Sequence, residues 1–252
     1  MRGTDHVICF AVLYSLAPEA QANRDEADGD ASRIETTDML PWTFAPRSTR
    51  SLVVSSFGGY DAHVDTSTFS TSLAYAPIDR LTLRIVAAHG PPSGKLTSSA
   101  GALVGILRED GAGIALAVGG EYTTHGWSQV PAAIATVVVG RTIGSYQLVS
   151  NTAVGFGLEE AELYGDLRVA VLRLVTRRLT LGLDSQARID LERDDDEPPG
   201  EAEWDLRAGP VATYAWRRFA ITAAAGISAS QLRGSEMVRA GPAASLGFGA
   251  AF

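Results

Sequence analysis

The sequence has little cysteine and no apolar run long enough for a membrane-spanning helix. Its single cysteine, Cys9, cannot form a disulfide within the chain. No window beyond residue 17 approaches the roughly 18 consecutive apolar residues of such a helix, which excludes one from the rest of the chain. Lys and Arg number 21 against 29 Asp and Glu, and the formal net charge is −8. With no cationic stripe, this balance excludes nucleic acid as a partner.

The first 22 residues have the features of a secretory signal peptide. Arg2 precedes an apolar run from Val7 to Ala17, which leads to the small-residue cleavage pattern Ala20-Gln21-Ala22. We therefore expect export and cleavage after Ala22. Residues 23–49 begin with an acidic stretch that is poor in apolar side chains. We expect this N-terminal segment to lie outside the folded domain.

Apolar and polar residues alternate from residue 50 onward, as they do in half-buried β-strands. Within 179–191, for example, Leu179, Leu181 and Leu183 share one face, whereas Asp184 and Arg188 belong to the other. The connections between strand-like segments alternate between short and long. The predicted strands are 50–58, 67–76, 80–88, 98–107, 112–122, 130–140, 144–156, 163–174, 179–190, 203–215, 218–228 and 239–252.

The last predicted strand is amphipathic and closes on phenylalanine. Leu246, Phe248, Ala250 and Phe252 share one face, and small or polar residues occupy the other. This ending resembles the assembly signal of bacterial outer-membrane β-barrel proteins, with Phe248 and Phe252 as its aromatic positions.

The resemblance implies an all-β fold: a transmembrane antiparallel up-and-down β-barrel of about 12 strands over residues 50–252. It implies that both termini and segment 23–49 are periplasmic, because the short turns of such barrels face the periplasm. It also implies an outer-membrane location, with the barrel assembly machinery and outer-membrane lipid or lipopolysaccharide as partners. A secreted soluble β-sandwich or barrel is the alternative, since alternation alone occurs there too.

Aromatic residues fall near the ends of the predicted strands. Trp204, Tyr214 and Trp216 share one face of the tenth strand, with Trp204 at one end and the other two at the opposite end. This spacing predicts two interfacial aromatic girdles. In a soluble β-protein such aromatics would more often be central and buried.

The opposite strand faces carry charged residues of both signs. We predict that they line the lumen, where they either border a wet constriction that selects solutes by charge or pair with one another to fill the space. Most other inward positions are Gly, Ala, Ser or Thr, which would leave room for water in the modest interior of such a barrel. The candidate lumen residues are Arg84, Glu121, Asp166, Arg168, Asp184, Arg188, Asp190 and Arg207.

Three functions are consistent with these features. The first is a passive, porin-like channel for small polar solutes. The second is a barrel with a closed lumen that serves as a structural or surface-binding protein through its external loops. The third is an outer-membrane lipid hydrolase, for which His125 and Ser128 are the nearest approach to a Ser–His pair. Because their spacing is wrong for one strand face, we assign no catalytic residue and expect a protein that is not an enzyme.

Metal and cofactor sites are not predicted. His63, His89 and His125 fall at or beyond the rim with the long connections, and Asp61 and Asp65 lie near the first. No pair of them has tight ligand spacing, so we expect solvated loop histidines. The acidic loop 191–202 lacks the alternating ligands of a calcium-binding hand.

Overall fold

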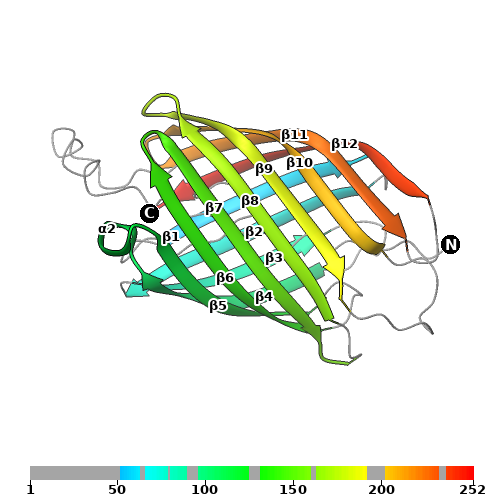
Figure 1. Ribbon diagram of the computed structural model, residues 1–252. Coiled ribbons are helices and arrows are strands. Elements are labelled where there is room, and N and C mark those ends of the chain that lie inside the picture. The colour runs from blue at the N-terminus through cyan, green and yellow to red at the C-terminus, as the bar shows by residue number, and fades with distance from the viewer. Residues whose placement is uncertain are drawn as a thin grey trace.

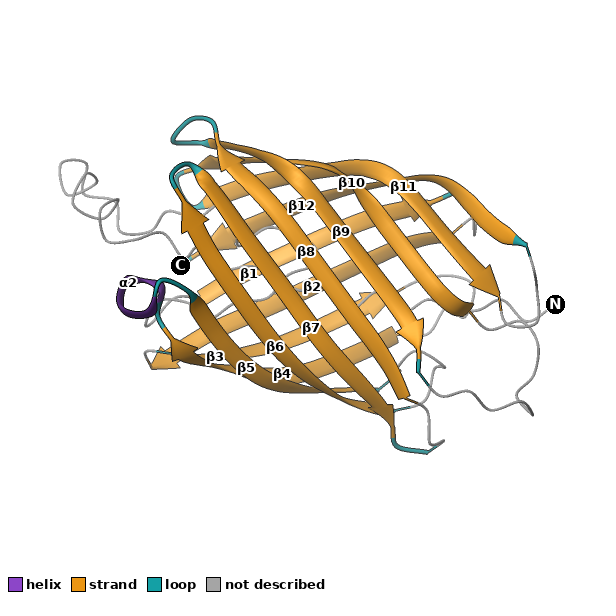
Figure 2. Cartoon of the chain, in the orientation of Figure 1, coloured by secondary structure: helices purple, strands orange, loops and turns teal. Residues whose placement is uncertain are grey.

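The computed structural model describes residues 52–62, 66–78, 80–89, 96–124, 131–159, 163–191, 202–232 and 237–252. The predicted signal peptide (1–22) and N-terminal segment (23–49) lie outside these residues, as do His63, His125 and Ser128. In the part of the chain that is described, no helix is long and apolar enough to cross a membrane. The described residues form one β-barrel with a single short helix (Figures 1 and 2).

Twelve antiparallel strands follow one another around the barrel, and β1 pairs with β12 to close it. The prediction of an all-β, up-and-down barrel of about 12 strands is confirmed. The strands are β1 (Leu52–Asp61), β2 (Thr66–Ile78), β3 (Leu81–His89), β4 (Leu96–Leu107), β5 (Ala115–Thr123), β6 (Ala132–Ile143), β7 (Tyr146–Gly157), β8 (Leu163–Leu174), β9 (Leu179–Asp190), β10 (Ala202–Trp216), β11 (Phe219–Leu232) and β12 (Val238–Ala251).

The seam between β1 and β12 is a regular antiparallel ladder. Its register runs without interruption from Val53 facing Ala251 to Asp61 facing Ala243. Beyond it, the Phe252 N–H donates to the Leu52 carbonyl at 2.8 Å, and the Leu52 N–H donates to the Phe252 carbonyl at 3.1 Å. The seam therefore leaves no open sheet edge along this ladder.

The short connections gather at one end of the barrel, here called the turn end, where the C-terminus also lies (Figure 1). The opposite, loop end carries the longer connections. Between β4 and β5, the short connection contains the helix α2 (Glu109–Ala112), and Gly113 ends it with a left-handed φ of 72°. The predicted strand 112–122 was wrong at its start, because the Ala112 N–H hydrogen-bonds back to the Arg108 carbonyl and β5 begins only at Ala115.

Strand alternation separates an apolar outer face from a largely polar inner face. In β9, Leu181, Leu183 and Ile189 are exposed on the outer face, whereas Asp184 and Gln186 are buried inside. The same division recurs around the barrel. Every strand has at least one large apolar or aromatic side chain exposed on the outer face, and on β1 this side chain is Tyr60. A barrel wall with this pattern can contact hydrocarbon with its apolar outer face but not with its polar inner face.

Exposed aromatic side chains on the outer face lie toward the two ends of the strands. Trp204 lies on this face near the loop end of β10 and donates from Nε1 to Gln231 Oε1 at 2.9 Å. Tyr214 and Trp216 lie on the same face near the turn end. The others are Tyr60, Phe69, Tyr122 and Phe156 toward the loop end, and Tyr75, Tyr146, Phe219 and Phe248 toward the turn end.

The two faces should differ in their tolerance of a new carboxylate. We expect Leu183→Asp, on the outer face, to destabilise the refolded barrel by about 2 kcal/mol, because a charge would face hydrocarbon. Asn151→Asp is the matched control, since Asn151 is buried on the inner face with Arg168 opposite it. Urea unfolding of both variants in lipid vesicles measures the difference. Equal losses of stability would contradict the assignment of faces.

Candidate functional site

The barrel interior collects the buried charges of the described residues. Arg84, Asp166, Arg168, Asp184, Arg188 and Arg207 are all buried on the inner face, and Glu121 and Asp190 are half-buried there. Alternation alone turns these side chains inward, because each occupies an inward position of β3, β5, β8, β9 or β10. All of them except Asp184 and Asp190 belong to three groups along the wall.

The first group is an ion pair that spans a strand. Arg84 of β3 donates from Nη2 to Glu121 Oε2 of β5, with β4 between them. Gly101 of β4 faces both residues in the ladder. A Cβ at position 101 would lie 2.7 Å from the Gly120 carbonyl oxygen and 2.9 Å from the Glu121 Cβ. Glycine at this position therefore leaves the space in which the pair meets.

The second group centres on the buried carboxylate of Asp166. Arg168 donates to both of its oxygens, from Nε at 2.8 Å and from Nη2 at 3.1 Å. Gln186 donates to Oδ2 at 2.8 Å, and Arg188 donates to Oδ2 from Nε and Nη2 at 3.2 Å each. The Arg188 guanidinium also lies 6.0 Å from the centre of the Tyr164 ring. Two guanidinium groups thus share one carboxylate on adjacent strands.

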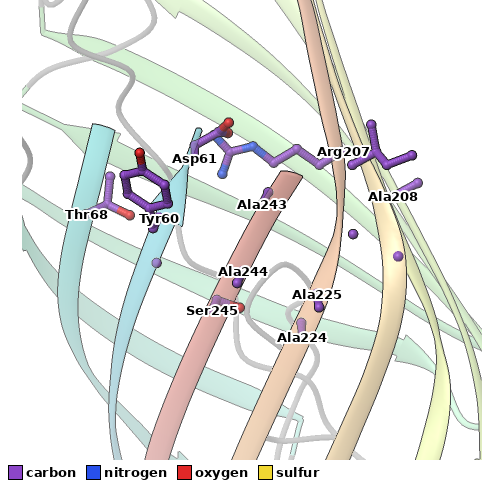
Figure 3. Close-up of a pocket in the computed structure, with 14 residues that line it drawn as sticks. Tyr60, Asp61, Thr68, Arg207, Ala208, Ala224, Ala225, Ala243, Ala244 and Ser245 are labelled. Atoms are coloured by element: carbon purple, nitrogen blue, oxygen red, sulfur yellow. The ribbon is translucent and has the colours of Figure 1, made fainter. Parts of the chain in front are cut away.

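The third group crosses the seam of the barrel. Arg207 extends from β10 over β11 and β12 to Asp61 on β1, as Figure 3 shows. Its Nη2 lies 2.9 Å from Asp61 Oδ2, and Ser228 donates to the other oxygen of this carboxylate. Asp205 on the same strand lies farther from Arg207, at 4.0 Å from Nε. The ion pair joins β1 to β10 across the seam, and the hydrogen bond from Ser228 adds β11.

Sequence reasoning considered Asp61 only as a metal ligand beside His63. The predicted first strand ended at residue 58, three residues before β1 ends. Alternation from Val53 through Phe57, had it been continued, would have placed Asp61 on the inner face. Asp205 and Gln186 were likewise missed as partners, although each lies two residues from a predicted lumen arginine on its strand.

A small cavity of about 40 Å³ lies beneath the Asp61–Arg207 pair (Figure 3). Its inner-face lining is mostly Gly and Ala, including Gly209, Gly226 and Ala243. A Cβ at Gly209 would lie 2.1 Å from the Ala225 carbonyl oxygen, and one at Gly226 would lie 2.2 Å from the Ala208 carbonyl oxygen. Only glycine permits the close backbone approach of β10 and β11 that forms this wall.

Asp184 differs from the other buried charges. It is only 1% exposed, and no side chain among the described residues hydrogen-bonds to its carboxylate oxygens. Its cross-strand neighbours are Ala170 on β8 and Gly209 on β10, which offer no polar side chain. Arg168 lies diagonally across the ladder, where its Nε and Nη2 are engaged by Asp166.

An apolar belt lines the inner wall toward the turn end. It is a cluster of buried residues on β4 to β8 and β10: Leu103, Ala117, Val138, Val149, Ala170, Leu172 and Val211. Two leucines lean over glycines on the next strand, because a Cβ at Gly119 would lie 2.9 Å from Leu103 Cδ1 and one at Gly182 would lie 2.7 Å from Leu172 Cδ2. The expectation of an inner face of small and polar residues with a few charges was incomplete, since alternation alone does not rank inward side chains by size.

The described residues offer no group of three or more His, Cys, Asp or Glu that could hold a metal ion. His89 lies at the loop end of β3, where it faces Phe69 of β2. His63 lies outside the described residues, as do the His125 and Ser128 of the hydrolase hypothesis. The buried side chains described above supply ionic and hydrogen-bonding groups to the barrel interior.

Removal of the shared carboxylate should destabilise the barrel. We expect Asp166→Asn to lower the free energy of unfolding by about 3 kcal/mol, because it leaves two buried guanidinium groups facing each other. Adding Arg188→Gln to this variant should restore part of the loss by removing one of the like charges. Equilibrium unfolding in detergent of the two single variants and the double variant gives the coupling energy. An unchanged midpoint for Asp166→Asn would contradict the network.

Solved structures with a similar fold include porins and an outer membrane channel. The NanC porin has a TM-score of 0.59 at 8% identity, over 78% of this chain and 98% of its own. The KdgM porin has a TM-score of 0.54 at 6% identity, over 79% and 99%. The COG4313 outer membrane channel from Pseudomonas putida F1 has a TM-score of 0.50 at 10% identity, over 81% and 96%. No family model and no curated protein matches the chain. The chain therefore folds as a closed 12-stranded barrel that is similar in fold to these porins and to this channel.

Proposed function

We propose that the protein is a channel of the bacterial outer membrane that passes small polar solutes. The observation that carries this proposal is the charged inner wall of a closed 12-stranded barrel. Burial of paired charges costs more desolvation free energy than filling the same space with apolar side chains. Arginine and carboxylate groups around the wall would instead offer a polar solute successive hydrogen-bond partners. The porins and channels of similar fold support the same function.

The proposal includes a place in the membrane. A signal peptide at residues 1–22 would direct export, Phe248 and Phe252 would be recognised by the barrel assembly machinery, and the turn end would face the periplasm with segment 23–49. The outer face supports a membrane boundary at the turn end, where arginines lie beside aromatic rings. The Arg173 guanidinium lies 5.4 Å from the centre of the Tyr146 ring, and Arg217 lies 5.5 Å from that of Trp216. Such pairs suit the lipid headgroup region, where an apolar body and a charged tip are both accommodated.

The apolar belt would be the narrow part of this channel. Water leaves a narrow apolar constriction more readily than a polar one, so the belt would limit the flow of ions and polar solutes. It also favours the second candidate function, a barrel with a sealed lumen that acts through its surface. The buried state of Leu103 and Leu172 is the observation behind that alternative.

Single-channel recording distinguishes the two functions. Refolded mature protein in a planar bilayer should give small, discrete current steps. The inward charged residues, here called the charged layer, should admit ions, whereas the apolar belt should restrict their flow. A recording without current steps at any applied voltage, after insertion has been verified, would overturn the channel proposal and favour the sealed barrel. Vesicle swelling in neutral sugars of increasing size then gives the size limit for solutes.

Shortening the belt side chains should widen the passage. We expect Leu103→Ala with Leu172→Ala to raise the single-channel conductance by about twofold or more, because both side chains point into the lumen and lose three carbons each. Leu181→Ala is the matched control, since it makes the same change on the outer face. A conductance that does not respond to the double substitution would place the constriction elsewhere.

A further inference from the structure

Among the described residues, no side chain forms an ion pair or hydrogen bond with the carboxylate of Asp184, although this group is almost fully buried. An isolated buried charge is unfavourable, so it either pairs with a cation or loses its charge. Arg168 lies diagonally across the ladder, and its Nε and Nη2 donate to the two oxygens of Asp166. Of the positions beside Asp184, Ala170, Gly209 and Gly182 have no donor side chain, and Gln186 donates to Asp166.

The balance of charge on the inner face also favours a cation. Six carboxylates stand against four guanidinium groups among the buried or half-buried charged side chains described there. The guanidinium groups are those of Arg84, Arg168, Arg188 and Arg207, and the carboxylates are those of Asp61, Glu121, Asp166, Asp184, Asp190 and Asp205. An anion that entered would meet this excess of negative charge.

The position of Asp184 along the barrel gives the site a role. Ala170, which faces Asp184 in the ladder, belongs to the apolar belt. On the loop-end side, Gln186 and Arg188 of the same strand belong to the Asp166 network. On β9, Asp184 is therefore the last charged group before the belt for an ion that comes from the loop end.

We propose that Asp184 is a subsite for a monovalent cation at the boundary between the charged layer and the apolar belt, and that it gives the lumen a preference for cations. This inference rests on the proposed channel function. The carboxylate replaces part of the hydration shell that the ion loses as it approaches the belt. The positive charge of Arg168 nearby keeps the site weak, which suits an ion that must also leave.

Reversal potentials in a KCl gradient test the preference. We expect Asp184→Asn to lower the ratio of potassium to chloride permeability about fivefold, since one unit charge that acts on an ion through the water of the lumen is worth about that much. Asp190→Asn is the matched control, with the same charge change at the loop end of the same strand. Salt screens a charge at the mouth, so at high salt Asp190→Asn should match the unmodified protein while Asp184→Asn does not. Equal effects of both variants would overturn the subsite.

A measurement that needs no conduction separates this inference from the channel proposal. Binding of potassium to the folded barrel should raise its unfolding midpoint, compared with N-methylglucamine at equal ionic strength, because a ligand of the folded state stabilises it. We expect Asp184→Asn to abolish this potassium dependence and Asp190→Asn to keep it. A potassium effect without current would leave the subsite standing and remove the channel. A barrel that conducts, but whose unfolding midpoint does not depend on potassium, would leave the channel proposal standing and overturn the subsite.

Discussion

Backbone hydrogen bonding between β1 and β12 is the constraint on which the rest of the structure depends. In hydrocarbon no water is present to satisfy an open sheet edge, so a spanning sheet has to close completely. Closure is achieved by the ladder from Val53 to Asp61 and by the mutual hydrogen bonds of Leu52 and Phe252. Once the sheet is closed, its interior has a fixed size, and every inward side chain competes for that space.

Glycine residues on the inner face leave part of this interior volume to larger side chains on neighbouring strands. The pair of Arg84 and Glu121 meets over Gly101, Leu103 leans over Gly119, and Leu172 leans over Gly182. In each case a long side chain on one strand uses the volume that a neighbouring strand leaves free. Aromatic rings behave in the same way, since a Cβ at Gly155 would lie 2.0 Å from Tyr164 Cζ. Several glycines of the inner wall are thus complements of particular large residues.

Alternation predicted the fold and the face of each lumen candidate, because the direction of a side chain in a strand depends only on the parity of its position. It did not predict which charges meet. Arg207 and Asp61 are distant in sequence and become neighbours only when the seam closes. The belt was missed because contact among Leu103, Val149 and Leu172 depends on the stagger of strands, which no single strand encodes. The helix α2 was missed because its local hydrogen bonds interrupt alternation over a few residues only.

The mutual hydrogen bonds of Leu52 and Phe252 have a consequence for the order of the strands along the gene. Because these residues are already adjacent at the turn end, a short linker could join them, and new termini could be opened in a loop-end connection. Such a circularly permuted chain would keep every ladder of the barrel. It would also enclose Phe248 and Phe252 within the sequence without moving them in the fold. The folded state thus has no first strand, and the order in which the strands are translated matters only to the process that assembles them.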